Sequence, residues 1–189
     1  MTAATMTPPP QAPPKVADVP PGYEYVDGRL VEKPVGNKSS WVASEVFDLV
    51  RAYCRRTGFG VAFVADAGFQ CFPHKPSQVR KPDVSVVKCD PATYDPPDGW
   101  ETAVPTLVVE VVSPNETVYD LADKVADFRA AGTPLIWVID PPRRQATIYR
   151  ADGTLALVTD PADLSGENVL PGLIVPLTAV LPTVRPVAR

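Results

Sequence analysis

Two carboxylates stand out because of the segments in which they lie. Asp83 begins a β-prone run directly after Arg-Lys-Pro, and Glu110 lies inside the apolar run from 104 to 112. A carboxylate in such a run is costly to bury unless it is paired, protonated or bound to a metal. Mg²⁺ prefers carboxylate and water oxygens, and a metal held in this way can activate water and screen the charge of a phosphodiester. If adjacent strands bring Asp83 and Glu110 together, the residue types favour this chemistry.

A lysine is the third group that such a site often needs, because a cation orients the attacking water and stabilises the developing charge. Lys124 is the candidate, since it lies at the border of the apolar stripe of a helix expected over 118–131 and its ammonium can reach the sheet edge. Two simpler interpretations stay open. Asp83 can begin a strand without any catalytic role, and Lys124 can pair with Asp120 four residues earlier on the helix.

The elements that must position these residues follow from local patterns. Two β-prone runs around Asp27-Gly28 predict a hairpin over 23–32, and apolar residues at helical spacing predict a helix that Ser39 or Ser40 caps and Gly58 ends. The further strands expected are 60–65 and 67–72 as a hairpin, 82–88, 104–112, 135–139, and 145–150 with 155–159 as a second hairpin, before a closing segment at 171–181. The order strand, helix, strand over 104–139 predicts a right-handed parallel crossover.

Length and composition indicate one domain. The chain has 189 residues and 24 prolines, and seven of these prolines crowd the first two dozen positions. We therefore expect a disordered tail at 1–20, a domain over 21–183 and a C-terminal tail at 184–189. The chain has no leader pattern and no run of about 18 apolar residues, which predicts a cytoplasmic protein without membrane association.

Cysteine and charge content narrow the function classes. Three cysteines, without the paired spacing of a zinc site, predict reduced thiols. The net charge of −4 gives no support to nucleic-acid binding, so local basic clusters such as Arg51, Arg55 and Arg56 would have to supply it. His74, as the lone histidine, cannot form a histidine pair for a metal or a catalytic site.

An ordered set of motifs resembles the Uma-type family of "putative restriction endonucleases", within the PD-(D/E)XK nuclease superfamily. The motifs are YEYVDGRLVE at 23–32, RKPDVSVV at 80–87, VVEVVSP at 108–114, YDLADK at 119–124, AGTPLIWVIDP at 131–141 and LPGL at 170–173. The resemblance covers about 23–181. It implies an α/β fold with a restriction-endonuclease-like core, in which helices flank a mixed central β-sheet and extra β-hairpins are attached. It also implies that Asp83 and Glu110 are metal ligands.

The sequence departs from the superfamily pattern at a few positions. Val112 occupies the usual lysine slot two residues after Glu110, and Lys124 matches the position to which the lysine has moved in this family. Glu32 matches a family acidic residue, either as a further ligand or as a surface residue at a strand end. The histidine often found before the first helix is missing from 36–40, and Leu-Ile replaces the usual Glu-Tyr before Trp137.

The resemblance implies a Mg²⁺- or Mn²⁺-dependent DNA endonuclease that hydrolyses phosphodiester bonds. Asp83 and Glu110 would hold the metal, Lys124 would position the attacking water, and Glu32 would assist. The alternative is a catalytically inactive module of the same fold that binds nucleic acid or protein, and the acidic net charge and the departures favour it. An unrelated small-molecule α/β enzyme fits the motif set less well. DNA is the expected partner, and a homodimer is left open.

Overall fold

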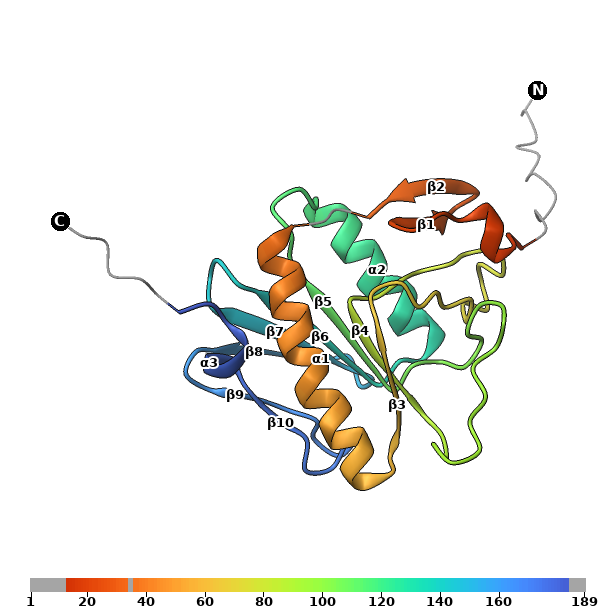
Figure 1. Ribbon diagram of the computed structural model, residues 1–189. Coiled ribbons are helices and arrows are strands. Elements are labelled where there is room, and N and C mark those ends of the chain that lie inside the picture. Colours follow the sequence, from red (N-terminus) through yellow and green to blue (C-terminus); the bar gives the residue numbers. More distant parts are fainter. Residues whose placement is uncertain (1–12, 34–35, 184–189) are drawn as a thin grey trace.

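A six-stranded mixed sheet lies between two helices in the computed structural model, which describes residues 13–33 and 36–183 (Figure 1). The strands, in their spatial order, are β3 (Gly60–Val64), β4 (Val84–Lys88), β5 (Leu107–Val111), β6 (Leu135–Asp140), β7 (Gln145–Arg150) and β8 (Leu155–Thr159). Helix α1 (Asn37–Thr57) covers one face, and α2 (Val118–Ala131) covers the other. This is the predicted fold class.

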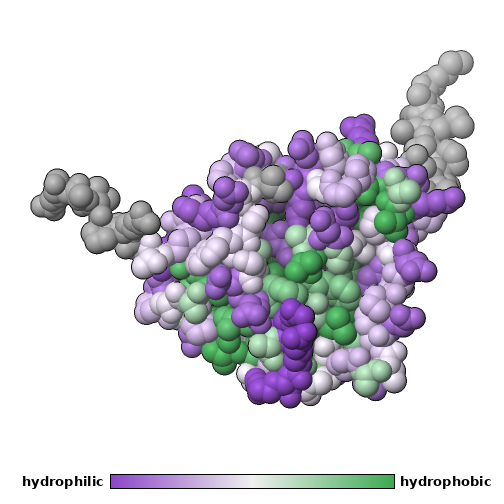
Figure 2. All heavy atoms as spheres, in the orientation of Figure 1, coloured by the Kyte–Doolittle hydropathy of each residue, from purple (hydrophilic) through white to green (hydrophobic). Residues whose placement is uncertain are grey.

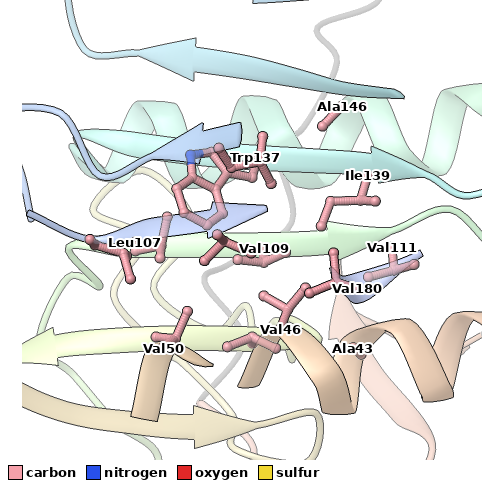
Figure 3. Close-up of a cluster of buried hydrophobic side chains, with 14 of the residues drawn as sticks. Ala43, Val46, Val50, Leu107, Val109, Val111, Trp137, Ile139, Ala146 and Val180 are labelled. Carbon is pink, nitrogen blue, oxygen red and sulfur yellow. The ribbon is translucent and has the colours of Figure 1, made fainter. Parts of the chain in front are cut away.

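The predicted crossover explains the only parallel pairing among these six strands. β5 pairs parallel with β6, and α2 connects them, whereas the other neighbours pair antiparallel. Every residue of β5 is buried, because both faces of the strand are covered. Val109 and Trp137 pack in the cluster beneath α1 (Figure 3), and Val108 and Ile136 pack beneath α2 with Phe128. A carboxylate in β5 therefore has no direct access to bulk water.

Two smaller antiparallel pairs form separate two-stranded sheets. β1 (Tyr23–Val26) and β2 (Arg29–Glu32) form the predicted hairpin, with φ values of 47° at Asp27 and 81° at Gly28, as a tight hairpin turn requires. β9 (Asp163–Ser165), β10 (Ile174–Pro176) and the short helix α3 (Leu177–Val180) pack against the core on the α1 side.

Two local predictions were wrong. Residues 67–72 do not form a strand with 60–65, because β3 pairs instead with β4, and the buried Phe69 makes isolated bridges to Arg80 and Glu101. Neither Ser39 nor Ser40 caps α1. The helix begins one turn earlier, after an extended Gly36, and the Ser39 hydroxyl donates to the Gly36 carbonyl at 2.9 Å.

Part of the expected N-terminal tail, before β1 begins at Tyr23, packs against the domain. Residues 1–12 of the expected N-terminal tail and all of 184–189 lie outside the described residues. Within 13–20, the chain forms the 3-10 turn η1 (Val16–Asp18), Val19 is 3% exposed, and the Pro14 carbonyl accepts from the Trp100 indole N–H at 2.8 Å. In the part of the chain that the structure describes, no helix is long and apolar enough to cross a membrane.

Candidate metal and catalytic site

Asp83 directly precedes β4, and Glu110 lies in the neighbouring strand β5, at one end of the sheet. The antiparallel register pairs Val84 with Val109, so its extension by one residue sets Asp83 opposite Glu110. Directly opposed residues of an antiparallel pair project to the same face. The Val111 N–H donates to Asp83 Oδ2 at 2.8 Å, which holds this carboxylate against β5. The two carboxylates therefore occupy adjacent positions on one side of the sheet.

Glu110 is buried without full hydrogen bonding. Its side chain is almost inaccessible, its Oε2 lies 3.5 Å from Lys124 Nζ, and its Oε1 has no hydrogen-bond partner among the described residues. Burial raises the pKa of Glu110 to about 8; the Lys124 charge opposes this rise, and the Asp83 charge adds to it. A buried oxygen without a partner is costly, and a bound cation would relieve that cost.

Lys124 reaches the sheet from α2, as one of the two sequence interpretations requires. Its Nζ lies 3.3 Å from Glu116, 3.5 Å from Glu110 and 3.8 Å from Glu24, and the residue is 4% exposed. Burial acts to lower the pKa of Lys124, but the three carboxylates outweigh it and raise the pKa above its ordinary value. The ammonium is therefore held in its charged form.

The exposed Lys124–Asp120 pair does not form among the described residues. Asp120 instead bonds to Thr117: its Oδ2 accepts from the Thr117 hydroxyl at 2.6 Å, and its N–H donates to Thr117 Oγ1 at 3.1 Å. Thr117 is the N-cap residue of α2. Lys124 is thus left free to point inward.

A buried charge network that motif analysis missed surrounds these residues. Glu24 in β1 accepts from the Lys81 N–H at 2.9 Å and from Arg80 Nη1 at 3.0 Å. Arg80 also donates through Nε to Asp127 of α2 at 2.8 Å. Lys33 Nζ lies 2.8 Å from Asp83 Oδ1. Arg80 and Lys81 stand beside Asp83 in the sequence, but no periodicity marks Glu24 as buried.

Glu32 lies at the rim rather than in the centre. It ends β2 with its side chain exposed, and it makes no ion pair among the described residues. It nevertheless lines a cavity of about 70 Å³ together with Lys124. The remaining polar residues of that cavity are Glu24, Lys33, Arg80, Glu116, Asp120 and Asp123. The structure therefore places Glu32 near Lys124 but in no ion pair with the predicted site residues.

The donor set fits a hard divalent cation held by few protein ligands. No cluster of three or more His, Cys, Asp or Glu residues in 13–33 and 36–183 is arranged to hold a metal. Mg²⁺ is often bound by one or two carboxylates and completes its shell with waters and substrate phosphates. Asp83 and Glu110 supply two carboxylates, and Glu110 Oε1 is free to ligate.

Comparisons with known proteins agree with this fold. The profile of the Uma2 family, described as "Putative restriction endonuclease", matches residues 15–179. A crystal structure titled as a "putative nuclease" of the DUF820 family from Anabaena variabilis superposes with a TM-score of 0.69 and 20% sequence identity, covering 89% of this chain and 97% of that chain. No curated protein matches the sequence.

Proposed function

Because this chain belongs to the Uma2 family of "putative restriction endonucleases", we propose that it is a metal-dependent DNA endonuclease that hydrolyses phosphodiester bonds. The observation that carries the proposal is Glu110. A carboxylate buried in a central strand, with one oxygen unpartnered, lies opposite Asp83 and against Lys124. Burying a carboxylate with an unpartnered oxygen costs stability, and a bound cation would offset this cost.

Asp83 and Glu110 would hold Mg²⁺ or Mn²⁺, which supplies Lewis-acid chemistry when bound. The Val111 N–H and Lys33 orient the Asp83 carboxylate. Lys124 stays protonated, and its ammonium donates a hydrogen bond to the attacking water or to a non-bridging phosphate oxygen. Negative charge develops on that phosphate oxygen during the reaction. Glu24, itself held by Arg80, limits the positions that the Lys124 ammonium can adopt. Glu32, at the cavity rim, would assist on the side from which the substrate approaches.

Cleavage and metal binding by ligand variants test this proposal. Asp83→Asn and Glu110→Gln should each lower the cleavage rate of supercoiled or linear DNA by about 100-fold or more, since each weakens a ligand of the metal that would stabilise the negative charge of the transition state. Mn²⁺ binding, measured by calorimetry, should weaken in parallel. Asp163→Asn, an exposed aspartate on β9, is the matched control and should leave both unchanged. An Asp83→Asn protein that cleaves at the wild-type rate overturns the assignment.

The inactive module remains the second candidate because of one specific feature. Lys33 and Lys124 already neutralise Asp83 and Glu110, at 2.8 Å and 3.5 Å, so the carboxylates are paired without a metal. An inactive protein that keeps the fold could retain these pairs for structure alone. Wild-type protein that binds no Mn²⁺ and cleaves no DNA form would support this candidate over the endonuclease.

A further inference from the structure

A groove runs along α1 and the edge strand β3, and one end of it reaches Asp83 of the candidate site. It consists of two cavities of about 200 and 850 Å³, which share Phe47 and Val64 among their lining residues. The smaller cavity includes Asp83, and the larger one reaches Arg51 and Arg55. Figure 2 shows apolar side chains gathered on this face beside α1, with hydrophilic side chains around them. The groove therefore connects Asp83, one of the two candidate metal ligands, to a basic end of the molecule.

The periodicity of α1 produces this alignment. The groove residues Ser40, Ser44, Phe47, Arg51 and Arg55 follow one another at intervals of three or four, so they share one side of the helix. At about 1.5 Å per residue, Ser44 and Arg55 are about 16 Å apart along the axis. β3 forms the opposite wall, and its register with β4 sets its last residue beside Val84, next to Asp83.

The basic end carries cations without an ion-pair partner in the described part of the chain. Arg51, Arg55, Arg56 and Lys88 make no ion pair among the described residues, although the chain as a whole has a net charge of −4. Arg55 and Arg56 lie in the last turn of α1, where the helix dipole favours a cation, but this explains neither Arg51 nor Lys88. Asp90 is the one carboxylate among the residues that line the larger cavity.

Cationic groups and aromatic rings occur together in this region. The Arg51 guanidinium lies 5.7 Å from the centre of the Phe47 ring, and Lys88 Nζ lies 5.5 Å from that of Phe59. Arg51 and Phe47 both line the larger cavity, whose other walls are mostly Val, Ala and Gly. Aromatic rings and guanidinium planes accept stacked bases, and guanidinium groups bind phosphates.

We propose that this groove binds an unpaired strand of the nucleic-acid substrate next to the bond that is cut. The inference rests on the proposed function and names its substrate class. Phosphates of the strand contact Arg51 and Arg55, and one base stacks against the Phe47 ring, over which the Arg51 guanidinium lies. An unpaired strand fits better than a duplex, because a duplex encloses its bases and presents only phosphates and groove edges to an apolar floor.

Binding of fluorescein-labelled oligodeoxythymidylate of about 20 nucleotides, followed by anisotropy in EDTA so that no cleavage occurs, tests the proposal. Wild-type protein should bind this strand more tightly than a mixed-sequence duplex of equal length. The double variant Arg51→Ala/Arg55→Ala should lose roughly tenfold in affinity and lower the salt slope by about 1.4, the value for two lost phosphate contacts on a single strand. Phe47→Leu, which keeps an apolar side chain in place, should lose about fivefold or more without a change in slope.

Arg129→Ala is the matched control, because Arg129 is an exposed arginine in the last turn of α2, on the opposite face of the sheet. It should bind like the wild type. Groove variants that bind the strand normally overturn the inference, and so does an equal loss for strand and duplex or an absence of strand binding. If Asp83→Asn abolishes cleavage while the groove variants bind normally, the endonuclease stands and the groove falls. If no DNA form is cleaved but strand binding depends on Arg51 and Arg55, the reverse holds.

Discussion

Replacing Lys124 with methionine removes a cation that lies within 4 Å of three buried carboxylates, while it keeps the length and volume of the side chain. Glu116, Glu110 and Glu24 lie 3.3, 3.5 and 3.8 Å from Nζ, and none of their side chains is more than 5% exposed. Each contact is worth about 4–5 kcal/mol before desolvation at the effective dielectric constant of proteins. Breaking one buried pair costs about 3–5 kcal/mol net.

Proton uptake by a buried carboxyl group limits the loss of stability in this variant. Without the lysine, a further one of the three carboxylates can take up a proton. Its ordinary pKa is 4.5, so protonating it at pH 7 costs about 3.4 kcal/mol. A carboxyl group with a raised folded-state pKa contributes stability below about pH 4.5 and loses it as the pH rises. Burial already raises the pKa of Glu116, and loss of Lys124 raises it further. We therefore expect Lys124→Met to lower the free energy of unfolding by about 3–4 kcal/mol at pH 7 and about 1.4 kcal/mol at pH 5.5.

Urea unfolding in EDTA at the two pH values measures these differences. The double variant Lys124→Met/Glu116→Gln should recover more than half of the loss, because one unpaired carboxylate is gone. Lys38→Met, on the exposed face of α1, is the matched control and should change stability by less than about 0.5 kcal/mol. A Lys124→Met protein that loses under about 1 kcal/mol at pH 7, or whose loss grows as the pH falls, would refute this reasoning. The cleavage rate of Lys124→Met is therefore measured at a temperature at which its unfolding curve shows the protein to be folded.

Two further predictions concern the thiols and one glycine. Near pH 8, the native protein should show one accessible thiol, the half-buried Cys89, which reacts with a disulfide reagent before the other two, and three reactive thiols after unfolding. Burial raises the pKa of all three thiols, but Cys54 and Cys71 are also inaccessible, and their pKa values rise to about 11 and about 12. Two equally fast thiols in the native state would contradict this. Gly60→Ala should lower stability by about 1–3 kcal/mol, because the added Cβ would overlap the Val87 carbonyl oxygen and push β3 away from β4. Thermal unfolding measures this change, and an unaltered melting temperature would show that the strand edge yields freely.

Local sequence signals were sufficient where neighbouring residues decide the structure. The apolar spacing over 118–131 predicted α2 at its observed bounds, and Asp27-Gly28 predicted the β1–β2 turn. The apolar run around Glu110 predicted a strand covered on both faces, because only a central strand buries every side chain. The ordered motifs then identified the family, which single patterns could not do.

Tertiary structure decided what lies between distant segments. Residues 67–72 had the composition of a strand, but β3 pairs with β4, which begins twenty residues after β3 ends. Sequence left two partners open for Lys124, and only the packing of α2 beneath the sheet selects the buried carboxylates over Asp120. Glu24 joins the same cluster from a hairpin whose alternation resembles that of any surface strand. Periodicity reports which face of an element is buried, but the charges that meet inside depend on how separate elements cross the end of the sheet.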